Sequence, residues 1–375
     1  MGYGLNMGKL CKEVGSKRQR NSNIEFLRMF CMFIIIIQHA VFYSGCVNID
    51  CSINQYWVNF FYIGGKLGSN CFLFVSAYYL VGRPFRFKGI LKTHNSMWFY
   101  SIIFFILNYF VGFREYRFVD VAETLFPMFY QSYWFCSAYI GMLLISPFLN
   151  KLMDTISREQ HKLLLVFLGA LMAMPATILP GAIAFTDQTH IPLALFIYLL
   201  SGYVKKYLAE ETDNAFYKKM LFVSLVIVWG SSFLAVFVGG VFHKETLITS
   251  SRYLMSGESI PMILASMSIV LLTIKKPVRF NGIINKISKG TLDVYLIHMN
   301  HFVYMWLWNI ALPLQDRYTS KVFPLFVLMY ACIVFCVSII IGNVRSIILN
   351  YMESKFEIWK NLNRKIEEIE SILNK

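Results

Sequence analysis

Ten apolar runs, each close to the length of a bilayer-spanning helix, dominate this sequence of 375 residues. The hydrocarbon core of a membrane is about 30 Å thick, and an α-helix crosses it with about 20 residues. The backbone has no water partners in hydrocarbon, so spans of this length are helices. The sequence predicts an all-α, polytopic membrane protein with about ten transmembrane helices, over approximately 24–43, 57–82, 96–113, 133–150, 163–182, 191–208, 220–240, 256–274, 290–311 and 322–344.

Composition excludes the class of partner that a large positive charge would otherwise suggest. The chain has a formal net charge of +14, but it is 57% hydrophobic and only 15% charged. Soluble domains carry roughly 25% charged residues. A nucleic-acid-binding protein places its basic residues in a patch on a polar fold, whereas here Lys and Arg lie at the ends of apolar runs. The expected partner is the lipid bilayer, and no nucleic acid is expected.

Basic residues also predict which ends of the spans face the cytoplasm, because cytoplasmic connections carry an excess of Lys and Arg. With the N-terminus inside, the inner connections hold 16 of these residues and the outer connections hold 6. Both termini are therefore expected to be cytoplasmic, and the first run is expected to be a retained span with no cleavage site after it. The chain divides into a basic N-terminal segment (1–22), a membrane domain (23–346) and a cytoplasmic amphipathic tail (347–375).

The tail carries apolar residues at helical spacing. They are Ile358, Leu362, Ile366, Ile369 and Leu373. Such a stripe predicts either a helix that lies on the inner membrane surface or one that self-associates, which would make the protein a homo-oligomer.

The first span contains three ionisable side chains, which are costly in a membrane and therefore mark candidate functional sites. Arg28 and His39 are eleven residues apart, so they share one helix face and lie roughly 16 Å from each other along the axis. Glu25 lies one turn before Arg28 on nearly the same face. A polar path into the membrane is one interpretation. The alternative is an interfacial Glu25–Arg28 pair, with His39 turned towards the outer surface.

An Arg-x-x-Arg sequence, Arg83 to Arg86, follows the second span on the expected cytoplasmic side. Two guanidinium groups at this spacing can grip phosphate oxygens in bidentate fashion. The alternative is that both residues are ordinary positive-inside anchors.

Aromatic and imidazole side chains recur in two later spans. Tyr295, His298 and His301 are spaced by three in the ninth span, so they lie along one side of that helix. His298 could line a cavity or form structural hydrogen bonds between helices. Trp134 and Tyr139 lie near the start of the fourth span, where aromatic residues are often part of the interfacial belt.

Lys66 is an unusual charge near the outer end of the second span. It lies between Gly64-Gly65 and Gly68. The glycines predict a helix that is broken or closely packed at this point.

The cysteines do not form a metal-type Cys/His pattern, and no metal is expected. Five of the eight lie inside apolar runs, whereas Cys46 and Cys51 share one polar loop. On the expected topology this loop is outside the cell, where disulfides persist. A disulfide and two free thiols both remain compatible with the sequence.

Five short motifs together resemble those of the acyltransferase family 3 membrane proteins, in the family's order along the chain. The resemblance extends from residue 22 to about 345, and the family's usual Ser-Gly is Ser76-Ala77 here. The motifs are Asn23-Ile24-Glu25-Phe26-Leu27-Arg28 leading to His39-Ala40, Phe72-Leu73-Phe74-Val75-Ser76, Arg83-Pro84-Phe85-Arg86, Trp134-Phe135 with Tyr139-Ile140-Gly141 and Ser146-Pro147, and Tyr295-Leu296-Ile297-His298.

The resemblance implies an O-acetyltransferase of a bacterial plasma membrane. It would move an acyl group, usually acetyl from acetyl-CoA, to a hydroxyl of a cell-surface carbohydrate. By analogy, His39 would be the central catalytic residue, as general base or as carrier of the acyl group, with Glu25 and Arg28 in support. Arg83 and Arg86 would bind the CoA phosphates. Four residues would line the substrate cavity, namely Trp134, Tyr139, Tyr295 and His298.

A transporter or a flippase of a lipid-linked glycan is the competing interpretation. It would also combine many spans with buried charges. Such proteins are commonly built from internal repeats with matching broken segments, and the sequence contains no recognisable repeat of this kind.

Overall fold

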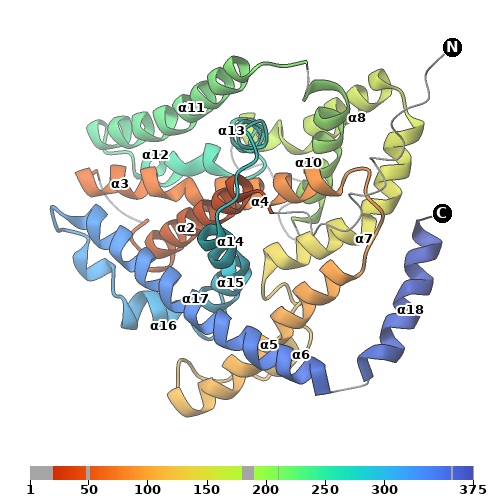
Figure 1. The fold of residues 1–375 in the computed structure, drawn as a ribbon. Coiled ribbons are helices and arrows are strands. Elements are labelled where there is room, and N and C mark those ends of the chain that lie inside the picture. The colour runs from red at the N-terminus through yellow and green to blue at the C-terminus, as the bar shows by residue number, and fades with distance from the viewer. Residues whose placement is uncertain (1–19, 48–50, 180–189, 210, 356–357, 375) are drawn as a thin grey trace.

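The computed structural model of the protein describes residues 20–47, 51–179, 190–209, 211–355 and 358–374. Every regular element within these ranges is a helix, which agrees with the expected all-α class. Most of the predicted N-terminal segment, 1–22, lies outside the described residues. Figure 1 shows α2 and α4 in the middle of the bundle, with α11 and α17 on its flanks.

The helices vary widely in length, from single turns to α17, which has 33 residues. In chain order they are α2 (Ser22–Tyr43), α3 (Ile53–Tyr62), α4 (Gly64–Leu80), α5 (Lys88–Val111), α6 (Val119–Leu125), α7 (Trp134–Thr155), α8 (Arg158–Met172), α9 (Pro175–Ile178), α10 (Ile191–Tyr203) continued by a π-helical turn (Val204–Leu208), α11 (Asn214–Val241), α12 (Glu245–Thr249), a 3₁₀ turn (Ser250–Met255), α13 (Ile260–Ile274), α14 (Gly282–Ile287), a 3₁₀ turn (Ser288–Gly290), α15 (Thr291–His298), α16 (Tyr304–Trp306) continued by a π-helical turn (Leu307–Ala311), a 3₁₀ turn (Gln315–Arg317), α17 (Phe323–Lys355) and α18 (Ile358–Leu373).

Six helical stretches among the described residues are long and apolar enough to cross a membrane. They are Ser22–Tyr43, Trp134–Thr155, Ile191–Leu208, Asn214–Val241, Glu245–Ile274 and Phe323–Ile348. The protein is therefore a multi-pass membrane protein by helix length and composition. The count of ten spans and the cytoplasmic position of both termini stay predictions.

Two of the other expected spans are interrupted. The range 57–82 is divided at Ile63 into α3 and α4. The range 290–311 is divided after His298, where α15 ends. Asn300 stabilises this second break, because its side-chain oxygen accepts the Phe302 N–H and its amide donates to the Tyr133 hydroxyl at 2.7 Å. Hydropathy could not reveal these breaks, since apolar residues continue on both sides of each one.

The glycines beside Lys66 are the contact between α4 and α2, as their clustering predicts. A methyl group on Gly68 would lie 2.8 Å from the Cys31 carbonyl oxygen, and methyl groups on Gly64 and Gly65 would also collide with α2. Small residues allow membrane helices to approach this closely and to gain van der Waals contact. The approach brings Lys66 and His39, on neighbouring helices, to one cavity.

The C-terminal helix α18 contacts the segment that contains Arg83 and Arg86. The Phe85 N–H donates to the Asn374 side chain at 2.6 Å, and the Phe87 N–H donates to Glu370 at 2.7 Å. Neither tail interpretation anticipated this contact within the chain. Binding to the membrane surface and self-association stay predictions.

Candidate active site

His39 lies near the C-terminal end of α2 and faces the end of α15. Its Nδ1 atom is 2.9 Å from Nε2 of His298. Both side chains are buried, since His39 is 8% exposed and His298 is 0% exposed. Residues 259 positions apart in the sequence thus form one imidazole pair. His298 is the last residue of α15.

The hydrogen-bond directions in this pair follow from a third group, the Val294 carbonyl oxygen, which lies 2.5 Å from His298 Nδ1. A carbonyl oxygen can only accept, so His298 Nδ1 carries the proton. Neutral His298 then has a lone pair on Nε2, and this lone pair accepts the Nδ1 proton of His39. The Nε2 atom of neutral His39 therefore has no proton and can accept one.

His39 forms part of the wall of a cavity of about 210 Å³. The other walls come from α3, α4, α7 and α15, and they include Lys66, Trp134, Phe135 and Tyr295. Aromatic rings with a few polar groups are the usual lining of a small-molecule site. The site thus combines a histidine, a lysine and aromatic faces around one cavity.

Two of the predicted cavity residues, Tyr139 and His298, do not line this space, and His298 meets it only through its contact with His39. The Tyr139 ring stacks on Phe135, with centroids 6.4 Å apart, and Phe135 in turn meets Tyr295 edge-on. Tyr139 therefore supports the cavity wall from behind.

Glu25 and Arg28 lie at the other end of α2 from His39 and do not line its cavity. Arg28 pairs with Glu25 at 3.2 Å, and the buried Glu25 carboxylate also accepts a hydrogen bond from Ser288 at 2.7 Å. This contact is the i,i+3 pair considered for the sequence, and its position at the membrane interface stays a prediction. A supporting role of the pair in catalysis stays a prediction.

A second cavity, of about 380 Å³, opens beside the N-terminal end of α2. Lys276 and Arg279 are among the residues that line it. By contrast, Arg83 and Arg86 are exposed in the segment between α4 and α5 and line neither cavity. The expected cytoplasmic side therefore presents two separate basic surfaces that could meet a phosphorylated donor.

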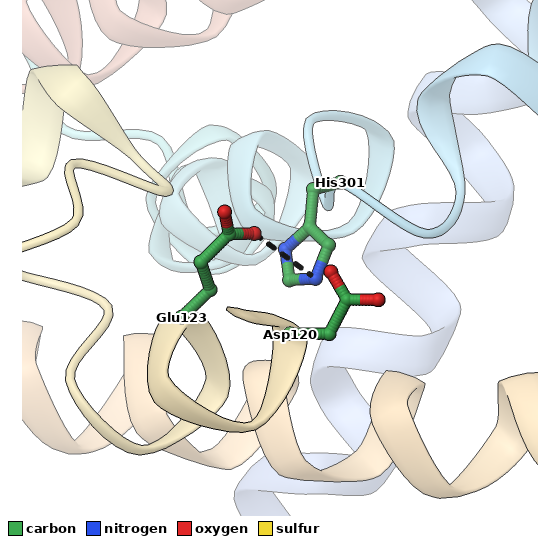
Figure 2. Close-up of side chains that lie close together, drawn as sticks. All are labelled: Asp120, Glu123 and His301. Carbon is green, nitrogen blue, oxygen red and sulfur yellow. Dashed lines mark ion pairs between the residues drawn. The ribbon is translucent and has the colours of Figure 1, made fainter. Parts of the chain in front are cut away.

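A cluster that the sequence did not predict joins α6 to the segment after α15. Asp120 and Glu123 of α6 and His301 of the segment after α15 bring potential metal-ligand atoms within 4.8 Å of one another (Figure 2). His301 Nε2 is 3.9 Å from Glu123. The break after His298 causes this arrangement, because it turns His301 away from His298 and towards α6.

Two arginines form ion pairs with Asp120. Arg114 binds both of its oxygens, at 2.7 and 3.0 Å, and Arg117 donates from its side chain and from its backbone N–H. Burial opposes ionisation of Asp120, but the hydrogen bonds from Arg114 and Arg117 outweigh burial and lower its pKa to about 2. A carboxylate bound in this way is better explained as an ion-pair brace than as a cation ligand. Arg114 also lies over the Phe302 ring, so the brace extends to the segment that follows His298.

The sequence marks Lys66 as an unusual charge but does not indicate its role or two of its neighbours, His190 and Glu258. Glu258 could have been found, because it is an acidic residue in the expected span 256–274. Ionisable side chains inside a span are costly and mark candidate functional sites, which is the argument that indicated His39. His190 could not have been found in this way, since it comes directly before the sixth expected span in a polar connection.

Comparison with known proteins adds the family. Residues 21–343 match the family described as an acyltransferase domain, which is acyltransferase family 3. No curated protein and no solved structure matches the chain. The matched range covers α2 to most of α17 and includes every residue of the cavity wall. The chain therefore belongs to acyltransferase family 3.

Proposed function

We propose that this membrane acyltransferase moves an acetyl group from cytoplasmic acetyl-CoA to a hydroxyl of an extracytoplasmic or cell-surface glycan in a bacterial plasma membrane. The observation that carries the proposal is the hydrogen-bonded chain Val294–His298–His39. It leaves a basic nitrogen of His39 at a cavity with aromatic walls. Histidine suits this role because its charge changes near neutral pH.

In the proposed reaction His39 Nε2 acts on the acceptor hydroxyl. It removes the proton as general base while the hydroxyl oxygen attacks the thioester carbonyl. The same lone pair could instead attack the thioester and carry the acyl group to the acceptor. In both routes His298 is a positioning residue, because its contact with Nδ1 determines which His39 nitrogen is basic.

The two substrates are proposed to arrive from opposite sides. CoA is polyanionic, so its nucleotide would stay at the cytoplasmic surface near Arg83 and Arg86, while its thin pantetheine arm reaches between the helices. Trp134 and Tyr295 would offer ring faces to the sugar. The aromatic composition of the cavity supports this assignment.

Replacing His39 with Ala tests the proposal. Membranes from cells that express His39→Ala should transfer acetyl from radiolabelled acetyl-CoA to endogenous glycan at least about 100-fold more slowly than wild type. The exposed His243, on the connection between α11 and α12, provides the control, because His243→Ala should transfer at the wild-type rate. Wild-type transfer by His39→Ala, in protein that is expressed and inserted normally, would contradict the role of His39.

Mass spectrometry of surface glycans then separates transfer from export. Deleting the gene should remove acyl esters and leave the glycan. Loss of the whole glycan would instead identify a transporter or flippase.

A further inference from the structure

Lys66 belongs to a second, partly buried chain of polar groups, which runs from donor to acceptor in the same sense as the first, beginning at a residue of the cavity wall. Its Nζ atom is 3.5 Å from His190 Nε2, and His190 Nδ1 is 3.3 Å from the Glu258 carboxylate. Glu258 is only 3% exposed and also accepts a hydrogen bond from the Ser256 hydroxyl. Because a carboxylate accepts, neutral His190 donates from Nδ1 and accepts on Nε2. Lys66 Nζ therefore donates to His190 Nε2.

Trp134 holds this chain in place. The Lys66 ammonium lies 4.4 Å from the Trp134 ring centroid, and the His190 ring lies 4.3 Å from the same ring. A cation over the face of an indole is stabilised by the ring quadrupole, most strongly where water is excluded. The Trp134 face therefore accommodates a cation at this position.

Lys66 and His39 line the same cavity of about 210 Å³. One helix supplies a nitrogen that can accept a proton, and its neighbour supplies a fixed positive charge. This combination suits a reaction in which a hydroxyl is deprotonated while negative charge develops on a carbonyl oxygen.

We propose that Lys66 is the electrophilic residue that stabilises the oxyanion formed during acyl transfer, with His190, Glu258 and Trp134 as positioning residues. The inference rests on the proposed function. It adds the group that receives the developing charge, for which neither the motifs nor the His39–His298 pair provides a candidate.

In the general-base route, His39 Nε2 takes the acceptor proton as the acceptor oxygen bonds to the thioester carbon. The carbonyl π electrons move to the carbonyl oxygen, and the Lys66 ammonium stabilises the negative charge there. The C=O bond then re-forms, the C–S bond breaks, and the leaving thiolate takes the proton from His39. An ester and free CoA result. The acyl-histidine route passes through an oxyanion at the same carbon, so Lys66 would serve it equally.

Kinetics of Lys66→Met test the proposal, because Met is close in length and uncharged. Removing one oxyanion stabiliser typically lowers kcat about 10²–10³-fold. We expect a loss of this size in membranes supplied with radiolabelled acetyl-CoA, with the KM for acetyl-CoA near its wild-type value. An interaction made only in the transition state lowers kcat and kcat/KM equally. Lys66→Arg should recover part of the rate, and the exposed Lys244→Met, between α11 and α12, should behave as wild type.

Lys66→Met removes a positive charge near the buried Glu258 carboxylate, so a charge-balanced variant is needed if the single variant does not fold. Lys66→Met/Glu258→Gln removes both charges and should show the same loss of kcat. A wild-type kcat in either folded variant, or a loss confined to KM, would overturn the oxyanion role. If wild-type protein itself transfers no acetyl, the proposed function fails. If wild type transfers and His39→Ala does not, a rate-neutral Lys66→Met overturns the Lys66 inference alone.

Discussion

Single residues decide the chemistry of this site through the atoms that they orient. His298 matters because its Nδ1 is bound to a backbone carbonyl, which leaves Nε2 to accept from His39. The pair is thus arranged before any substrate arrives, and the basic nitrogen of His39 is determined by a residue on another helix.

Substitutions of His298 should separate positioning from packing. His298→Ala should lower kcat by roughly 10²-fold, a typical contribution of correctly placed acid–base groups. His298→Gln should retain more activity, because its amide oxygen can still accept the His39 proton. Measuring acetyl transfer by both variants checks whether His298→Gln is more active than His298→Ala. Equal activity of the Ala and Gln variants would contradict a hydrogen-bonding role.

Asp120 gives a prediction about pH. Its pKa of about 2 in the folded protein lies below the ordinary value of 3.8, so ionisation of Asp120 favours the folded state. This stabilisation is complete above about pH 4 and is lost as the pH falls towards 2. Asp120→Asn should lower the stability at neutral pH by roughly 2 kcal/mol, through weaker hydrogen bonds to Arg114 and Arg117. The substitution should also reduce the loss of folding stability that the wild-type protein shows as the pH falls from about 4 to about 2.

Thermal unfolding in detergent between pH 2 and 7 measures both effects of Asp120→Asn. If the variant loses as much thermal stability as wild type between pH 4 and pH 2, Asp120 does not dominate the pH dependence in this range.

At the scale of elements, the contact between α2 and α4 shapes the cavity. The glycines of α4 allow α2 to lie against it, so His39 and Lys66 reach the same space. An ordinary side chain there would separate the two helices.

Gly68→Ala tests this contact. Its new methyl group would lie 2.8 Å from the Cys31 carbonyl oxygen, and backbone cannot move aside cheaply. Overpacking of this kind typically costs about 1–3 kcal/mol. The matched control is Gly230→Ala on α11, where a methyl group meets nothing within 4 Å. Thermal unfolding of the two variants should differ, with Gly68→Ala lower than wild type and Gly230→Ala not lower.

At the scale of the whole molecule, the proposed acyl donor must reach His39 from the expected cytoplasmic side. His39 lies roughly 16 Å along α2 from Arg28. Two basic surfaces lie on the expected cytoplasmic side, one at Arg83 and Arg86 and one at the cavity of Lys276 and Arg279.

Paired double variants distinguish these surfaces. Arg83→Ala/Arg86→Ala should raise the KM for acetyl-CoA several-fold, because each removed guanidinium loses a charge-assisted contact with phosphate. Lys276→Ala/Arg279→Ala is the comparison and should leave this KM unchanged. The opposite result would place the CoA phosphates at the second cavity and return Arg83 and Arg86 to the role of anchors.

Several features could be predicted from the sequence because each depends on local composition. The all-α class follows from apolar runs of span length, and the close packing of α4 follows from its glycines. His39 stood out because an ionisable group inside a span is costly. The sequence placed His301 on the same helix side as Tyr295 and His298, because residues spaced by three lie on one side of a continuous helix. That expectation was wrong because α15 ends at His298, and His301 lies beside Asp120 and Glu123 instead.

The sequence by itself determined that this protein is a helical membrane protein with the motifs of acyltransferase family 3, because apolar length and local motifs are properties of contiguous residues. Only the tertiary structure decided which polar groups meet. It paired His39 with His298, joined Lys66 to His190 and Glu258, and put Glu25 and Arg28 outside the cavity of His39. Such contacts depend on helix breaks and on packing between distant segments, and neither is encoded in spacing along one helix.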